Sequence, residues 1–332
     1  MKIVPIATLA AALLLGPVNA QAACRLVTAD VPVTMEGLRP LVAAKIDGKP
    51  IKLLLDSGAF GTSLAASFAA EAKLAPVTAK AIGSLVPSSA STLTSGAKGH
   101  VQDTGLVIAS TFEFGGAVFP NVKFLTMRNV GGSAVGLLGQ NVLHNSDDEY
   151  DLKAGVLRLV RPQDCQGANL AYWATPQMTY SVLPLEATGH YGGAHTIAMI
   201  SINGQTMRAI FDTGADTSFI TARAAARAGV KTSDEGVKPA GLSRAVDGDV
   251  KTWVATFASV KIGDEEIKNA KLSIGETVAT NFDILIGADF FMAHHVYVAN
   301  SQGKLYFTYG GGPVFRTSAP QPTTASGDAR DH

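Results

Sequence analysis

The stretch "AIFDTGADTSFI", residues 209–220, places an acidic residue at the end of a hydrophobic run. Ala209, Ile210 and Phe211 predict a short buried strand, and the residues after them favour a turn. An aspartate at such a point is costly to bury unless a partner or a reaction uses it. Because a strand-end aspartate often only stabilises a turn, Asp212 by itself leaves a structural and a functional interpretation open.

The same pattern occurs a second time, 156 residues upstream (212 − 56). The two copies are "AAKIDGKPIKLLLDSGAFGTSL" (43–64) and "AMISINGQTMRAIFDTGADTSFI" (198–220). Each contains Asp-Gly or Asn-Gly between two apolar runs, and these dipeptides strongly predict a tight β-hairpin. Gly48 and Gly204 both precede an aspartate by eight residues (56 − 48 and 212 − 204), so Asp56 is the counterpart of the acid in the second copy.

The repeat continues downstream with a second constant offset. Three pairs of glycines lie 148 residues apart, namely Gly115 and Gly263, Gly139 and Gly287, and Gly155 and Gly303. The first copy therefore carries eight extra residues (156 − 148) between its Asp motif and Phe112. Unrelated segments would not keep register at three landmarks, so the sequence predicts two homologous units.

Each unit consists mostly of short apolar runs separated by turn residues, which is typical of β-structure. Short helices are expected after each Asp motif, in "SLAASFAAEAKLA" and "ITARAAARAG". The 332 residues therefore predict an all-β chain with two lobes. The expected segments are a signal peptide (1–22), a first lobe (24–162), a connector (163–180), a second lobe (181–312) and a disordered tail (313–332).

The charge balance and the absence of several motifs argue against some classes of function. Lys plus Arg and Asp plus Glu balance at 27 each, so the chain offers no net field to nucleic acid or to anionic membranes. No phosphate-binding loop, dinucleotide-binding motif or HExxH zinc motif is present, and no Cys/His cluster suggests a metal site. The adjacent residues His294 and His295 would point to opposite faces of a strand and are interpreted as ordinary residues.

The N-terminus is typical of an export signal. Lys2 is followed by an apolar stretch over residues 3–15, and Ala20-Gln21-Ala22 offers a small-x-small cleavage site. The apolar stretch is short for a membrane span, although a retained anchor is the alternative. We expect a periplasmic or secreted protein with no membrane span after signal cleavage. Its two remaining cysteines, Cys24 and Cys165, predict one disulfide, with two unpaired thiols as the alternative.

Two matching lobes that each present one aspartate at a strand end can bring these acids together on a pseudo-twofold axis. Two carboxyls a few ångströms apart do not both ionise cheaply, so one keeps its proton and the other stays charged. The charged group acts as general base on a shared water, and the neutral one protonates the carbonyl oxygen. Asp56 and Asp212 are thus the candidate catalytic pair, and the small neighbours expected to support them are Ser57, Gly58, Ala59, Thr213, Gly214 and Ala215.

The chain resembles the pepsin/retropepsin superfamily of aspartic proteases, and specifically exported bacterial members with two retropepsin-like units. "DTGADTSFI" is close to the retroviral-type signature, and "LLG" (137–139) and "LIG" (285–287) match the hydrophobic-hydrophobic-Gly that follows it. The resemblance covers about residues 40–160 and 190–308. It implies closed β-barrel-like lobes with a cleft between them, endopeptidase activity on an extended polypeptide, and no metal or cofactor.

The same resemblance implies hairpin flaps over the substrate. The candidates are residues 93–106 and 241–253, the second with Asp247-Gly248 as its turn. The eight extra residues of the first unit lengthen either its flap or a surface loop. No aromatic residue occurs in residues 78–110, so a counterpart of the pepsin flap tyrosine is missing.

Three other interpretations compete with a single-chain aspartic protease. A serine nucleophile at Ser57 lacks the Gly-x-Ser-x-Gly elbow. A pairing of two chains is unnecessary because one chain supplies both halves, so a monomer is expected. The main rival is a protein of this fold that binds peptides without cleaving them. The extra acids Asp216, Asp283 and Asp289 occur only in the second unit and are interpreted as structural.

Overall fold

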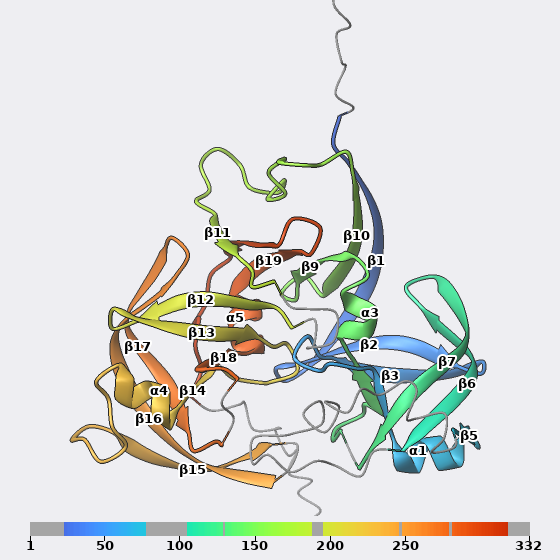
Figure 1. The fold of residues 1–332 in the computed structure, drawn as a ribbon, viewed down its shortest axis with the longest axis horizontal. Helices are drawn as coiled ribbons and strands as arrows, with labels where there is room; N and C mark the ends of the chain where they lie inside the picture. The colour runs from blue at the N-terminus through green and yellow to red at the C-terminus, as the bar shows by residue number, and fades with distance from the viewer. Residues whose placement is uncertain are drawn as a thin grey trace, which may run out of the picture.

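The computed structural model describes residues 23–77, 105–128, 130–187, 195–245, 248–278 and 281–317. Strands dominate these residues, and two closed six-strand barrels stand side by side, one from each repeat (Figure 1). The all-β, two-lobed fold expected from the sequence is therefore confirmed. The short helices α1 (Ala66–Glu71) and α4 (Ala222–Arg227) follow the two Asp motifs, as the sequence predicts.

The first barrel is a closed circuit in which β2 pairs with β6. Alternating burial along β2 turns Ile46 inward, where it shares the core with Leu53, Phe112 and Phe124. Neighbours in the circuit are hydrogen-bonded in the order β2 (Arg39–Ile46), β3 (Lys49–Leu55), β8 (Gly136–Leu138), β4 (Ser63–Ala65), β7 (Ala117–Met127) and β6 (Leu106–Phe114), with β5 (Ala75–Pro76) added at the edge.

The second barrel repeats this order and closes where β12 pairs with β16. Its core holds Met207, Phe257, Leu272 and Phe290, all buried. The circuit runs through β12 (Ile197–Ile202), β13 (Gln205–Phe211), β18 (Ile284–Ile286), β14 (Phe219–Thr221), β17 (Glu265–Gly275) and β16 (Gly248–Ile262), and β15 (Lys238–Ala245) extends β16 outward as a hairpin.

The two predicted tight hairpins are present. Asp47 and Gly48 have φ angles of 48° and 77° between β2 and β3, and Asn203 and Gly204 have 48° and 78° between β12 and β13. Two consecutive residues with positive φ make the turn whose twist matches that of the flanking strands. The Asp-Gly and Asn-Gly dipeptides thus fix the register that brings both aspartates to the ends of β3 and β13.

A third sheet joins the lobes, and the last hairpin of each repeat belongs to it. The hairpin of the first repeat pairs with that of the second through β9 and β19, where Tyr150 lies opposite Val296 (Figure 1). The order in this antiparallel sheet is β11 (Ser181–Pro184), β20 (Lys304–Tyr309), β19 (His294–Ala299), β9 (Asp147–Asp151), β10 (Val156–Gln163) and β1 (Arg25–Glu36). The ladder continues into the first barrel where β1 pairs with β2, and an isolated bridge between Leu185 and Ala198 links it to the second barrel. The helices α3 (Gln140–Leu143) and α5 (Ala288–Ala293) connect the barrels to this sheet along the chain.

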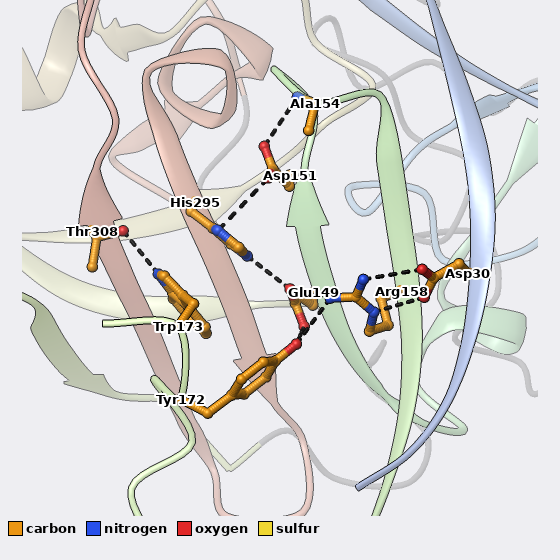
Figure 2. A network of polar contacts seen from close by, with 9 residues as sticks. All are labelled: Asp30, Glu149, Asp151, Ala154, Arg158, Tyr172, Trp173, His295 and Thr308. Carbon is orange, nitrogen blue, oxygen red and sulfur yellow. Dashed lines mark hydrogen bonds and ion pairs between the residues drawn. The ribbon is translucent and has the colours of Figure 1, made fainter. Parts of the chain in front are cut away.

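A polar network crosses this shared sheet (Figure 2). Glu149 on β9, only 2% exposed, accepts hydrogen bonds from Arg158 Nη1 (2.7 Å), His295 Nε2 (2.8 Å) and the Tyr172 hydroxyl. Arg158 also donates to Asp30 on β1, and the His295 ring stacks on Trp173 at 4.2 Å. Burial raises the pKa of Glu149, but hydrogen bonds from His295 and Tyr172 and the charge of Arg158 outweigh it and lower that pKa below its ordinary value.

Glu149→Gln is expected to lower the free energy of unfolding by about 1–3 kcal/mol at pH 7, because buried donors lose a charged acceptor. A carboxyl whose folded-state pKa is depressed stabilises the fold above its unfolded pKa and loses this effect as the pH falls through the folded value. The difference in the free energy of unfolding between the variant and the wild type should therefore be smaller at acidic pH. Urea unfolding at pH 7 and pH 3 measures it, and an equal difference at both pH values would contradict the ionic role of Glu149.

The two cysteines form the predicted disulfide. Cys24 at the start of β1 bonds to Cys165 just after β10, with a Cα–Cα distance of 4.4 Å. The bond closes a sequence separation of 141 residues. Cys24→Ser combined with Cys165→Ser should lower the free energy of unfolding by about 2–4 kcal/mol. Reduction of the wild-type protein is the control, since it removes the bond without changing a side chain; unchanged urea midpoints in both would refute this contribution.

Several sequence expectations fall on segments outside the described residues: the signal peptide, residues 93–104 of the first flap candidate, Asp247 in the second, and residues 318–332 of the tail. The first part of the expected disordered tail differs from that expectation. Val314 and Phe315 pack against the hydrophobic core, and Arg316 N donates to Asp289 Oδ2 at 2.8 Å. Within the described ranges, no helix is long and apolar enough to cross a bilayer.

Candidate active site

Each predicted aspartate stands at the end of a strand that pairs in parallel with a short central strand. Asp56 N donates to Leu138 O at 3.0 Å, and Asp212 N donates to Ile286 O at 2.8 Å. These backbone bonds continue the β3–β8 and β13–β18 pairings by one residue. The two carboxyl groups, each half-buried, meet between the barrels and hydrogen-bond to one another.

The neighbouring hydroxyls cross between the lobes. Ser57 N donates to Thr213 Oγ1 and Thr213 N donates to Ser57 Oγ, both at 3.0 Å. Ser57 Oγ in turn donates to Phe211 O at 3.0 Å, and Thr213 Oγ1 donates to Leu55 O at 2.7 Å. Both side chains are buried, so these four bonds lie in a low-dielectric setting that strengthens them. Each lobe thus fixes the position of the other's aspartate loop.

Gly58 and Gly214 leave the space in which the acids meet. A Cβ atom added to Gly58 would lie 2.1 Å from Asp212 Cγ, and one added to Gly214 would lie 2.3 Å from Asp56 Cγ. Any side chain at either position would therefore displace the opposite carboxyl. These distances also show that each carboxyl reaches across the seam to the backbone of the other lobe.

The glycines of "LLG" and "LIG", Gly139 and Gly287, lie directly against the backbone of the two aspartate loops. A Cβ at Gly139 would lie 2.7 Å from the Gly61 carbonyl carbon, and one at Gly287 would lie 2.6 Å from that of Thr217. This close approach lets Gln140 N donate to Ala59 O at 2.9 Å. In the second lobe, the corresponding bond runs from Ala288 N to Ala215 O at 2.8 Å. The two predicted alanines thus anchor their loops through backbone carbonyls.

The two aspartates do not titrate as ordinary surface acids. Burial raises the pKa of Asp56 well above its usual range, and the charge and hydrogen bond of Asp212 raise it further. Burial also raises the pKa of Asp212, opposed by the N–H of Gly214, which donates to Asp212 Oδ1 at 2.8 Å, and by the bond with Asp56. The pair therefore holds a proton at pH values where isolated carboxyls are ionised.

The additional acids of the second unit make structural contacts. Asp283 accepts from Arg208 N at 3.0 Å and from Arg227 Nη1 at 2.9 Å. Asp289 is fully buried and accepts from Ser218, Phe290 and Arg316 backbone nitrogens and from the Ser218 hydroxyl. Asp216 differs, because the charge of Arg39 in the first lobe acts on it across the seam and opposes the rise that burial imposes on its pKa.

Sequence reasoning missed two residues at this site. The Gln140 side chain, 3% exposed, donates from Nε2 to Ser57 O at 2.7 Å and so holds the first aspartate loop. His195 lies close enough to Asp212 for their charges to interact. An extension of the repeat alignment three residues upstream of 198 would have paired His195 with Arg39, since the offset is again 156 (195 − 39).

Three further observations concern where a ligand can bind. The second flap candidate is the β15–β16 hairpin, whose last described pair is Ala245 with Gly248. Leu242 on it is 66% exposed. Two surface hollows of about 360 and 180 Å³ lie elsewhere, the first beside Asp147 and Ser301 and the second beside Trp173. Across the described ranges, no group of three or more His, Cys, Asp or Glu residues is placed to hold a metal ion.

Comparison with known proteins identifies the family of this chain. A family model described as aspartyl protease matches residues 42–142 and 198–290, which together make up more than half of the chain. The two matched ranges follow the two repeats, and each contains one of the paired aspartates. No curated protein matches the chain.

Proposed function

Because the chain belongs to the aspartyl protease family, we propose that it is an endopeptidase in which Asp56 and Asp212 activate one water molecule against a peptide bond. One observation supports this reaction above the others: the two carboxyls hydrogen-bond across the seam while Ser57 and Thr213 brace both loops. A pair of acids that shares a proton combines a base and an acid within reach of one substrate.

The reaction proceeds without a covalent enzyme intermediate. The ionised carboxylate removes a proton from the water as its oxygen attacks the carbonyl carbon, and the protonated carboxyl gives its proton to the carbonyl oxygen. The tetrahedral diol then collapses: the amide nitrogen receives a proton from the first carboxyl, the C–N bond breaks, and a diol hydroxyl returns a proton to the second. The pair is left with one proton, ready for another turnover.

The substrate in this proposal is an extended polypeptide. The β15–β16 hairpin offers backbone groups for strand-like pairing, and apolar side chains such as the exposed Leu242 offer contacts for substrate side chains. We expect a monomer, since one chain supplies both aspartates. The Cys24–Cys165 disulfide supports an oxidising, exported location, either periplasmic or secreted.

The competing function is peptide binding without cleavage. The experiment that separates the two incubates the wild-type protein with an unfolded, reduced protein at several pH values between 3 and 7, with and without a chelator. Mass spectrometry should detect new internal termini, and the chelator should not reduce their rate of appearance. A peptide with a secondary alcohol in place of the scissile carbonyl should inhibit cleavage by mimicking the diol. Binding of this peptide without any cleavage of the protein substrate would instead establish the silent binder.

A further inference from the structure

The β12–β13 ladder places His195 opposite Asp212. Ile197 pairs with Ile210, and one step further Phe211 N donates to Thr196 O at 2.9 Å. The next step in the same register brings His195 level with Asp212. Side chains directly opposite on antiparallel strands point to the same face with their Cβ atoms about 4.5–5.5 Å apart. The imidazole therefore shares the face from which Asp212 reaches toward the seam.

The first lobe has the same geometry but a different occupant. Leu41 pairs with Leu54, so the ladder brings Arg39 level with Asp56. The guanidinium of Arg39 is engaged elsewhere: its Nη2 donates to Val130 O at 2.7 Å, and its charge acts on Asp216. The pseudo-twofold symmetry of the dyad is thus broken by the residue next to each acid.

The His195 ring has an unused polar atom. Its Nδ1 is buried and has no hydrogen-bond partner among the described residues. A buried polar atom without a partner is costly, which favours a role for the ring beyond packing. The negative charge of Asp212 acts on this ring and raises its pKa, which agrees with their opposite positions on the ladder.

We propose that His195 is a positioning residue that polarises the dyad, holding the negative charge on Asp212 and leaving the shared proton on Asp56. This inference rests on the proposed aspartic protease function. In its imidazolium form, His195 is a cation that the ladder places opposite Asp212, and it makes ionisation of that acid easier than ionisation of its partner. Asp212 would then be the base that takes the proton from water, and Asp56 the acid that protonates the carbonyl oxygen.

The charges around His195 are compatible with this role. Burial lowers the pKa of His195 and the nearby cation of Arg208 lowers it further, while Asp212 raises it. Arg208 is itself bound by Glu186, with Nε to Oε2 at 2.9 Å, and its backbone N–H donates to Asp283. His195 therefore takes up its proton in the acidic range, where a dyad holding one proton is active.

The first test measures the His195 pKa by NMR of its imidazole nitrogens, assigned by comparison with His195→Gln. Asp212→Asn should lower this pKa, because the facing anion is removed. Asp56→Asn should not lower it, because Asp212 then ionises alone. The two variants are matched by the symmetry of the repeat. Equal shifts in both, or a shift in neither, would overturn the proposal. This readout requires no cleavage, so it stands whether or not the endopeptidase proposal holds.

The second test compares pH profiles of kcat/KM. His195→Gln should move the acidic limb upward by about half to one pH unit, because the cation that favours dyad ionisation is lost. His195→Arg should restore the wild-type limb, and Arg39→Gln, at the symmetric position, should leave the limb unmoved. If the wild-type protein cleaves no substrate, the endopeptidase proposal is wrong. If the wild-type protein cleaves and the acidic limb of the His195→Gln profile is unchanged, only the proposed role of His195 is wrong.

Discussion

Asp212→Asn and Asp56→Asn are each expected to lower kcat by about 10²–10⁴-fold, since either change removes an acid or a base whose contribution is of that size. An asparagine keeps the size and the hydrogen-bonding capacity of the side chain but cannot exchange a proton. The fold should survive, because the bonds of Ser57 and Thr213 across the seam do not involve either carboxyl. Cleavage of an unfolded protein, followed through a fluorescent peptide derived from its cut site, measures the loss.

The matched control for this change is Asp216→Asn, which alters an acid in the same loop four residues further along. Asp216 interacts with Arg39 rather than with the dyad, so its replacement should cost far less activity. Far-UV circular dichroism and the unfolding midpoint establish that the dyad variants are folded. Residual cleavage in both dyad variants at the wild-type rate would exclude the two-carboxyl mechanism.

Gly58→Ala and Gly214→Ala are expected to lower kcat by about 100-fold or more with a much smaller change in stability. The added methyl would occupy the position of the opposite carboxyl, at 2.1 Å from Asp212 Cγ or 2.3 Å from Asp56 Cγ. The carboxyl is the end of a side chain and can move aside, so the fold yields at the dyad rather than in the backbone. A displacement of about 1 Å at reacting groups is enough for such a loss.

Gly61→Ala provides the control for the glycine variants. Its added Cβ would meet only Leu125 Cδ1, at 3.3 Å, although it lies in the same loop. Steady-state kinetics of the three variants should therefore separate the dyad glycines from their neighbour, while urea unfolding reports the stability of each. Wild-type kcat in Gly214→Ala would show that the two acids do not need the close approach present in the structure.

The sequence predicts the local parts of this protein well because those parts depend on short-range chemistry. Two consecutive residues with positive φ favour Asp-Gly or Asn-Gly, so these dipeptides predict both turns. Close backbone approach demands glycine, which is why Gly139 and Gly287 marked the repeat. The aspartates followed from their place after a buried strand in both copies.

The long-range parts were missed for an equally physical reason. Alternation of apolar residues indicates a strand but not its partner, so the pairing of β9 with β19 across the lobes could not be read from either segment. The bond from Gln140 to Ser57 depends on the closure of a barrel. His195 carried a weak signal, its register with Arg39, but only the ladder to Phe211 shows what it faces.

The shared sheet has a consequence for the order in which the candidate site is assembled during synthesis. Strand β9 stays without its partner from the second repeat until β19 has left the ribosome. The loop that carries Asp212 is synthesised after β9 and before β19. Because domains fold in the order of their synthesis, the first barrel and the strands β1, β10 and β9 can form while the edge of β9 that β19 will occupy is still unpaired. At the start of this period the nascent chain carries Asp56 without Asp212. Under the proposed function, the acid pair is complete only once the second repeat has been made and β19 has paired with β9.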